Sequence, residues 1–369
     1  MKESLRRRFL LGGAAPAGAL IVAFLLSSVI LLATGHNPFS AFGAMGSAMG
    51  DSLILVNTLN QAVTYYLSAA AVAIGFKMNL FNIGVDGQYR LAALVAAAVA
   101  GATWMGSLPG FLLIIITLVV AMAVGAIWSG IAGLLKVTRG VSEVITTIML
   151  NAIATALIAF LLLPSQLGVL QGNNVSTRKI TEGGQLTNIP VGGGNVLYTT
   201  IFLALIVGVG YAFLMNRTVF GFEVKATGLS ESAAIASGVD VKKTMLATML
   251  ISGALAGLVG MPELLNGSAA SYSLNFPAGI GFTGIAIALL GRNHPIGMIF
   301  SALLWSALNN SSDRLQGADV PKEMVTIMQG IILFAVVIAY ELVRRYRLTL
   351  EQKAVARALA TGAKPAVAA

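Results

Sequence analysis

Polar side chains recur at helical spacing inside two long apolar stretches of the chain. Residues at positions i, i+3, i+4 and i+7 or i+8 share one face of a helix, so each set forms a polar stripe. Amide and hydroxyl groups can donate and accept hydrogen bonds, which suits contact with a neutral polar molecule. The first set is Asn57, Asn60, Gln61 and Thr64, and the second is Glu143, Thr146, Thr147 and Asn151.

Two interpretations of these stripes stay open at this point. Polar side chains on membrane helices hydrogen-bond to neighbouring helices, a contact that contributes about 1 kcal/mol. They also line aqueous paths, because lipid cannot satisfy a polar group. The presence of two stripes in one chain favours a shared path. The residues predicted to line it are Asn57, Asn60, Gln61, Glu143, Thr147 and Asn151.

Residue patterns typical of enzymes are missing from the sequence. It has no cysteine, and its two histidines are His36 and His294. No Ser-His-Asp order, HExxH or GxxxxGK[ST] string occurs, which excludes thiolate metal sites, disulfides and ATP binding through a phosphate loop. We therefore expect no catalytic residues, no metal and no cofactor bound by this chain.

The composition predicts an all-α polytopic membrane protein. Of the 369 residues, 57% are hydrophobic and only 10% are charged, whereas a soluble domain has roughly 25% charged residues. The net charge of +9 does not indicate nucleic-acid binding, because the basic residues lie in short connectors and at both ends.

About ten apolar runs have the 17–25 residues that a membrane span requires. The eighth and ninth are short, and the string from Arg292 to Pro295 between them predicts half-helices or a tight hairpin. Gly253 and Gly257 form a small-xxx-small motif that predicts close helix packing. The expected spans are 9–33, 52–75, 80–101, 109–135, 141–164, 196–215, 244–265, 277–291, 295–310 and 321–342.

The basic residues predict the orientation of these spans. With a cytoplasmic N-terminus, all lysines and arginines fall on the cytoplasmic side, including Lys364, except Arg90 within a span and four outside. This bias predicts that both termini are cytoplasmic. The string RRRFLLGG resembles a twin-arginine export signal, but no small-residue cleavage site follows, so we expect a retained first helix. The four outside residues are Arg178, Lys179, Arg314 and Lys322.

Three polar segments outside the expected spans are long enough to form contacts with partners. The cytoplasmic loop 216–243 contains a short predicted helix of small residues, Ser232 to Ser237, which would suit docking of a soluble partner. The external loop 165–195 is either a solvated connector or a contact surface for an external partner. The cytoplasmic tail 344–369 is basic and then alanine-rich, and we assign it no function.

The third expected span opens with FNIGVDGQ, residues 81–88. Its glycines, Asn82 and Asp86 predict a helix break or a re-entrant turn, with Asn82 as a cap and Asp86 at the positive end of the helix dipole. Such a break is tolerated only where it lines protein or water.

The run GFKMNLFNIGVDGQYRLAA (Gly75 to Ala93) resembles the "FNIGVEGQ" signature of bacterial ABC-importer permeases for simple sugars and nucleosides, a family that includes ribose and branched-chain amino acid permeases. VSEVITTIMLN (Val141 to Asn151) resembles its nucleoside branch, and GFTGIAIALLGRNHPIG (Gly281 to Gly297) matches a third block. Asp86 replaces the commoner Glu and keeps the charge. The signature residues here are Asn82, Gly84, Asp86, Gly87 and Gln88.

The resemblance also assigns a role to the loop 216–243. Permeases of this class carry an "EAA…G" pattern whose helix docks on the ATPase, and here Ser232 stands where the first Ala is usual. Small residues would let the helix enter a cleft of its partner, and Gly238 would end it. An ordinary exposed loop helix is the alternative. The residues predicted to couple to the ATPase are Glu231, Ala233, Ala234 and Gly238.

The resemblance implies a type II-like ABC importer permease, residues 1–369 forming one transmembrane domain. Spans two to five and seven to ten would be pseudo-symmetric inverted repeats. The implied function is ATP-driven import of nucleosides across the bacterial cytoplasmic membrane. ATP and Mg²⁺ would bind to a separate ATPase, so this chain would not be an enzyme. The implied partners are that ATPase, a second and different permease chain, and an extracytoplasmic substrate-binding lipoprotein, with no nucleic acid.

Two other functions stay open on the sequence. The same machinery could carry a simple sugar such as ribose. An ion-coupled secondary transporter would instead require a buried carboxylate, for which Glu143 and Asp86 are the candidates. Nucleosides are uncharged, so amides, hydroxyls and a few aromatic rings would suit their path without a fixed charge. The aromatic candidates are Tyr65, Tyr66 and Phe276.

Overall fold

The computed structural model describes residues 2–171, 174–317 and 320–360, and most of them are helical. The last part of the predicted tail, 361–369 with Lys364, lies outside the described residues. The chain forms two compact units. One comprises the described parts of residues 1–48 and 311–369, and the other comprises the described parts of residues 49–310.

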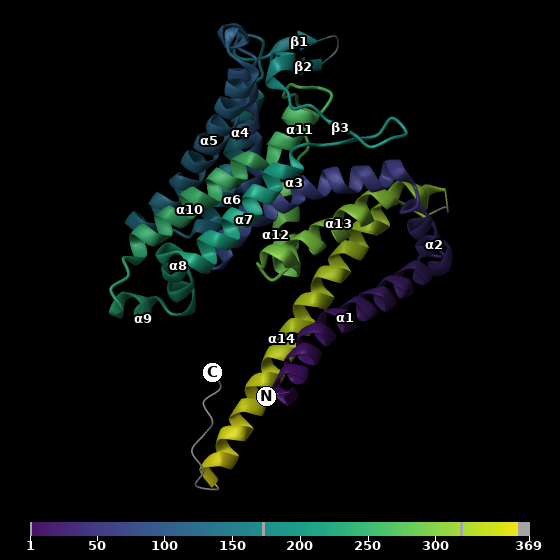
Figure 1. Cartoon of the computed structure of the whole chain (residues 1–369), viewed down its shortest axis with the longest axis vertical. Coiled ribbons are helices and arrows are strands. Elements are labelled where there is room, and N and C mark those ends of the chain that lie inside the picture. Colours follow the sequence, from purple (N-terminus) through teal and green to yellow (C-terminus); the bar gives the residue numbers. More distant parts are fainter. Residues whose placement is uncertain (1, 172–173, 318–319, 361–369) are drawn as a thin grey trace. The chain divides into compact units, whose positions relative to one another are not determined.

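The smaller unit is built from helices at the two ends of the chain. Helix α1 (Lys2–Ala33) lies beside α14 (Glu323–Ala360), as Figure 1 shows. The short helix α2 (Pro38–Ala48) follows α1, and the rings of Phe24 and Phe42 lie 4.4 Å apart. Helix α2 falls between expected spans and was not predicted.

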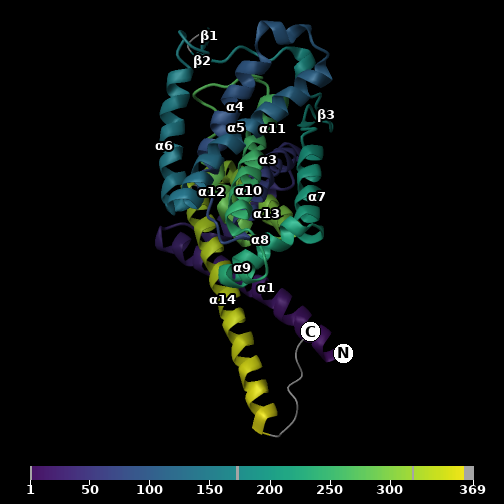
Figure 2. The ribbon, with the colours of Figure 1, turned by 90° about the vertical axis from the view of Figure 1, so that its left-hand side faces the viewer.

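The centre of the larger unit consists of helices rich in small residues. Residues Ala69–Ala73 of α3 have no solvent exposure, and α4 buries a similar series of alanines. Small side chains let membrane helices approach closely, which favours packing where lipid gives no hydrophobic drive. Helices α6 (Glu143–Leu161) and α7 (Ile201–Arg217) flank this centre on opposite sides (Figure 2). The central helices are α3 (Ser52–Phe76), α4 (Val85–Ala100), α5 (Gly110–Arg139), α10 (Val241–Gly257) and α12 (Ile280–Leu290).

Helices α5 and α10 pack backbone against backbone. A side-chain carbon on Gly253 would collide with the carbonyl oxygen of Gly125, and one on Gly257 would collide with that of Ala121. The Ser129 hydroxyl donates to the Met249 carbonyl at 2.8 Å across the same contact. The predicted role of Gly253 and Gly257 in helix packing is therefore confirmed.

The chain after α10 breaks inside the larger unit. A 3₁₀ turn, η3 (Leu258–Gly260), leads into the short helix α11 (Met261–Asn266), and a loop then runs to α12. With 11 residues, α12 is too short to cross a bilayer, since spans need about 20. A tight turn with positive φ at Arg292 and Asn293 joins α12 to α13 (Pro295–Gln316), as the sequence predicted.

The two ends of the larger unit carry different structures, which we call the β end and the α9 end (Figure 1). The α9 end carries α8 (Val219–Leu229) and α9 (Glu231–Ala236). The β end carries two short antiparallel pairs and two 3₁₀ turns, η1 (Thr103–Ser107) and η2 (Glu182–Gly184). The pairs are β1 (Val169–Gln171) with β2 (Asn174–Ser176), and β3 (Ile189–Pro190) with β4 (Val196–Leu197).

The apolar helices make this a multi-pass membrane protein. Among the described residues, four helices are long and apolar enough to cross a membrane, or up to six if each closely spaced helix pair forms one span. Each of the expected spans coincides with a helix, but α4 and α12 are short. The count of about ten spans and the inverted repeats stay predictions. The four long segments are Gly110–Arg139, Glu143–Leu161, Val241–Asn266 and Glu323–Leu342.

The backbone contact between α5 and α10 yields a stability prediction. We expect Gly253→Val to lower the thermal unfolding midpoint of the detergent-solubilised protein, because overpacking a close contact costs about 1–3 kcal/mol. Gly210→Val on α7 is the matched control, since nothing lies within 4 Å of a side chain there. Equal midpoints for the two variants would contradict the packing argument.

Candidate functional site

Residues 81–88, which we call the signature turn, join three helices through side-chain hydrogen bonds. The amides of Asn82 and Gln88 pair reciprocally, at 2.8 and 3.0 Å. The Asn82 amide nitrogen also donates to Ser252 on α10 at 2.8 Å, and the Ser252 hydroxyl donates to the Ala71 carbonyl on α3. Asn82 and Gln88 are fully buried, so this network replaces the water that their amides would otherwise require.

The start of α4 differs from the expectation in one respect. Gly84, not Asn82, is the N-cap, and no side chain caps the helix there. Asn82 lies too far upstream to reach the helical N–H groups, and its Oδ1 accepts instead from the Gly84 N–H. Gly87 is required by close approach, because a side-chain carbon there would lie 2.8 Å from Oδ1 of Asn151 on α6.

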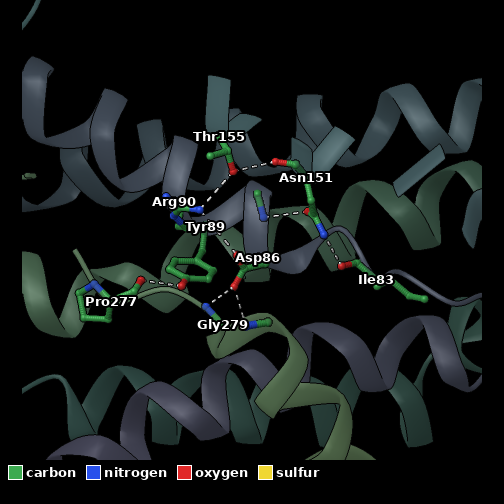
Figure 3. A network of polar contacts seen from close by, with 10 residues as sticks. Ile83, Asp86, Tyr89, Arg90, Asn151, Thr155, Pro277 and Gly279 are labelled. Carbon is green, nitrogen blue, oxygen red and sulfur yellow. Dashed lines mark hydrogen bonds and ion pairs between the residues drawn. The ribbon is translucent and has the colours of Figure 1, made fainter. Parts of the chain in front are cut away.

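Asp86 links the signature turn to the start of α12 (Figure 3). Its Oδ1 accepts from the backbone N–H of Gly279 at 2.8 Å and of Gly281 at 3.3 Å. Its Oδ2 lies 3.9 Å from the guanidinium of Arg90. The Tyr89 hydroxyl donates to the Pro277 carbonyl at 2.7 Å. The carboxylate therefore satisfies helix-start donors that lipid could not.

Three of the residues predicted to line a path lie on α6 against the signature turn. Asn151 accepts from the Gly87 N–H and donates to the Ile83 carbonyl, both at 2.9 Å. Glu143 pairs with Lys136 at 2.9 Å, and its other oxygen accepts from the Phe81 N–H. Thr147 donates to a carbonyl of its own helix. All three therefore have protein partners, and those of Asn151 and Glu143 include the signature turn.

The other three predicted residues line a polar cavity of about 390 Å³. Gln61 accepts from Ser306 and Asn310 of α13 at 3.1 and 2.8 Å, and Asn60 binds the backbone at Val196 and Tyr198. Cavities of about 300–1,000 Å³ are typical of small-molecule sites. The lining residues are Asn57, Asn60, Gln61, Thr64, Tyr65, Tyr198, Val259, Gly260, Glu263, Phe276, Pro277, Ala278, Ile280, Asn309 and Asn310.

The cavity contains a carboxylate that the sequence analysis did not single out. Glu263 of α11 lines it, so the expectation of a path without a fixed charge differs from the structure. Burial, with a contribution from the charge of Glu263, raises the pKa of Tyr198. Of the aromatic candidates, Tyr65 and Phe276 line the cavity, whereas Tyr66 packs against Gly208 of α7.

The α9 end presents a short helix with a defined start and stop. The Ser230 hydroxyl accepts from the Ala233 N–H and caps α9. Gly238 has φ of +87° and follows the helix, and the Val239 N–H returns to the Ala234 carbonyl at 3.0 Å. This is the glycine stop that the sequence predicted. The helix spans Glu231–Ala236, one residue earlier than expected.

The predicted coupling residues differ in exposure. Glu231, Ala233 and Gly238 are exposed, whereas Ala234 is 2% exposed and packs inward. The large apolar side chains of Leu229 and Ile235 are 89% and 58% exposed beside them. Helix α8, which was predicted as loop, precedes α9 and bends by 71° from α7.

The α9 end contacts the turn that precedes the signature turn. The Asn79 amide donates to the Gly228 carbonyl at 2.6 Å, and a side-chain carbon on Gly228 would collide with the Lys77 carbonyl. Burial lowers the pKa of Lys77, and the charges of Lys225 and Arg292 lower it further. Three basic residues from distant parts of the sequence are therefore near one another at this end.

The Asp86 contacts predict a specific loss of stability. Asp86→Ala would leave the N–H groups of Gly279 and Gly281 without their acceptor, and a buried unsatisfied group costs about 1–3 kcal/mol. We expect a lower thermal midpoint in detergent. Asp86→Glu retains the charge and should lose less. A stable alanine variant would show that these two bonds are dispensable.

The sequence of this chain is similar to those of several known permeases. The nucleoside ABC transporter permease NupB of Lactococcus lactis subsp. cremoris is 33% identical over 335 residues, 88% of this chain and 90% of that one. The guanosine ABC transporter permease NupP of Bacillus subtilis is 33% identical, covering 88% and 93%. The glucose ABC transporter permease TsgB13 of Haloferax volcanii is 31% identical, covering 90% and 88%.

A solved metal-chelate type ABC transporter, in an inward-facing conformation, aligns over 88% of this chain and 98% of that one. Its sequence is 16% identical to this chain, and the TM-score is 0.42. The family described as "Branched-chain amino acid transport system / permease component" matches residues 54–337, which include the signature turn, the cavity and α9. The chain therefore belongs to this permease family.

Proposed function

We propose that this chain is a permease subunit of an ATP-driven ABC importer for nucleosides. The observation that carries the proposal is the 33% identity, over 88% of the chain, to permeases named for nucleosides and guanosine. The cavity supports it, because its amides, hydroxyl and aromatic rings offer hydrogen bonds and a stacking surface to a polar heterocycle.

The cavity is the proposed substrate path. Asn57, Asn60 and Gln61 contact the nucleoside directly or through water. Glu143, Thr147 and Asn151 contribute to the path by holding α6 against the signature turn, whose residues Asn82, Gly84, Asp86, Gly87 and Gln88 fix the cavity wall. The aqueous path needs no bound cofactor in this chain, because ATP and Mg²⁺ bind to the partner ATPase.

The α9 end is the proposed ATPase contact. Glu231, Ala233 and Gly238 face the partner, while Ala234 holds α9 against the rest of the loop 216–243. The exposed side chains of Leu229 and Ile235 support this role, because unpartnered apolar groups mark interaction sites. Movement of α9 would reach the cavity through the Gly228–Asn79 contact, the signature turn and the Asp86 bonds to α12.

The proposed assembly resides in the bacterial cytoplasmic membrane with both termini inside. Lys77, Lys225 and Arg292 at the α9 end support a cytoplasmic location for that end. A second permease chain of different sequence completes the path, and a binding lipoprotein delivers substrate to the β end. The inverted repeats and a span count of about ten belong to the same proposal.

Vesicle uptake tests the function. We expect the chain, reconstituted with its ATPase, second permease and binding protein, to accumulate labelled guanosine only when ATP is enclosed with the ATPase. Glucose and ribose serve as competing substrates, since one relative is named for glucose. Uptake driven by an ion gradient without ATP, or sugar uptake in place of guanosine, would overturn the proposal.

The ATPase contact predicts the effect of a surface charge. We expect Ala233→Arg to reduce ATP-dependent uptake about tenfold, which corresponds to about 1.4 kcal/mol of coupling, and to reduce co-purification of the ATPase. Ser165→Arg near the β end is exposed and serves as the matched control. Ala233 is a sharper site than the buried Ala234, because its side chain faces outward. Normal uptake by Ala233→Arg would exclude α9 as the contact.

A further inference from the structure

Glu263 lies where a membrane protein rarely places a charge. It is on α11, within the apolar segment Val241–Asn266, and it lines the polar cavity. Among the described residues that line the cavity, it is the single carboxylate and none is basic. An ionisable residue within an apolar membrane segment marks a functional site, because keeping it there costs stability.

The Glu263 carboxylate also has no protein partner in the described part of the chain. Its backbone carbonyl accepts from the Gly267 N–H at 3.1 Å, but its side-chain oxygens make no hydrogen bond or ion pair there. This contrasts with Asp86 and Glu143, whose carboxylates both bind backbone N–H groups. A carboxylate only accepts hydrogen bonds, so the cavity's contents must supply the donors.

The surroundings of Glu263 favour one kind of donor. Phe276 also lines the cavity, and its ring lies 3.3 Å from the position of a side-chain carbon on Gly260, three residues before Glu263. The Phe276 ring, which stacks on Tyr272, and the Glu263 carboxylate therefore come from one wall. Helices α3 and α13 supply the opposing amides, including Asn57, Gln61 and Asn310.

We propose that Glu263 is the specificity-determining residue of the cavity and accepts hydrogen bonds from a purine base that presents two adjacent N–H donors. Guanine has this pattern at N1 and its 2-amino group, whereas adenine presents an acceptor at N1. The base contacts the Phe276 ring, and the sugar hydroxyls face the amides of α3 and α13. This inference rests on the proposed nucleoside function and names the class of base within it.

The two carboxylate oxygens match the two parallel donors of guanine. Loss of one oxygen should matter most for the substrate that uses both. A site built to hydrogen-bond a substrate strongly rejects analogues that lack the matching groups, because its polar atoms are then left unpaired. Adenosine should therefore depend less on Glu263 than guanosine does.

The test compares two substrates in the same transporter. The complete transporter, with wild-type chain or Glu263→Gln, is reconstituted in vesicles with ATP and the same binding protein, and initial uptake of labelled guanosine and adenosine is measured. Because the binding protein is unchanged, its own preference cancels between variants. We expect Glu263→Gln to lower the guanosine-to-adenosine ratio about tenfold. Glu182→Gln, an exposed acid at the β end, is the matched control and should leave the ratio unchanged.

The possible outcomes separate the role of Glu263 from the proposed function. An unchanged ratio, or an equal fall for both nucleosides, would overturn the assignment of Glu263 to the base. If Glu263→Gln does not assemble with the ATPase, the same ratio is measured in Glu263→Asp, which keeps the charge one methylene further back and should also lower it. Failure of the wild-type transporter to import any nucleoside would instead overturn the proposed function, and the inference with it.

Discussion

A helix that begins in the interior of a membrane protein exposes N–H groups that lipid cannot satisfy, and the Asp86 carboxylate accepts two of them from Gly279 and Gly281. Without this acceptor, the start of α12 would leave two backbone N–H groups unsatisfied within an apolar helical unit. Gly281 also lies so close to the Asp86 backbone that only glycine fits. The cavity wall formed by residues 276–280 exists because this contact holds it.

The Asp86 contact is also the last of a series of contacts that connects the α9 end to the cavity wall. The bond between Asn79 and Gly228 joins α8 to the turn after α3, and the signature turn follows within a few residues. Each step is a hydrogen bond or a close backbone approach in a packed interior, where displacement of one element must move the next. A contiguous network of this kind can carry coupling between the α9 end and the cavity.

The sequence predicted most of the helices because apolar runs of sufficient length have no other stable form in lipid. It also located α9 to within one residue and its stop at Gly238, since small residues followed by glycine have a clear local meaning. Helix α8 was missed because it is short and follows a sharp bend after α7. Helix α2 was missed because its 11 residues are fewer than a span requires.

Side-chain spacing predicted which residues share a helix face, but not whether that face lines a cavity or packs against another helix. The whole stripe on α3 lines the cavity, where Gln61 also contacts α13, whereas Asn151 on α6 binds the signature turn. Nothing in the spacing distinguishes these cases, because the difference arises from which helix packs alongside. Glu263 was missed for a related reason. A lone acid in an apolar run forms no pattern, and only the fold brings it beside amides from α3 and α13.

The charge of Glu263 has a consequence for molecules that are already negative. Two like charges confined in one cavity repel each other, so a phosphate ester would be opposed where the parent alcohol is accepted. A compound phosphorylated after its arrival in the cell would then be unable to return by the same route. The negative charge of one side chain would thus help to retain the phosphorylated compound in the cell.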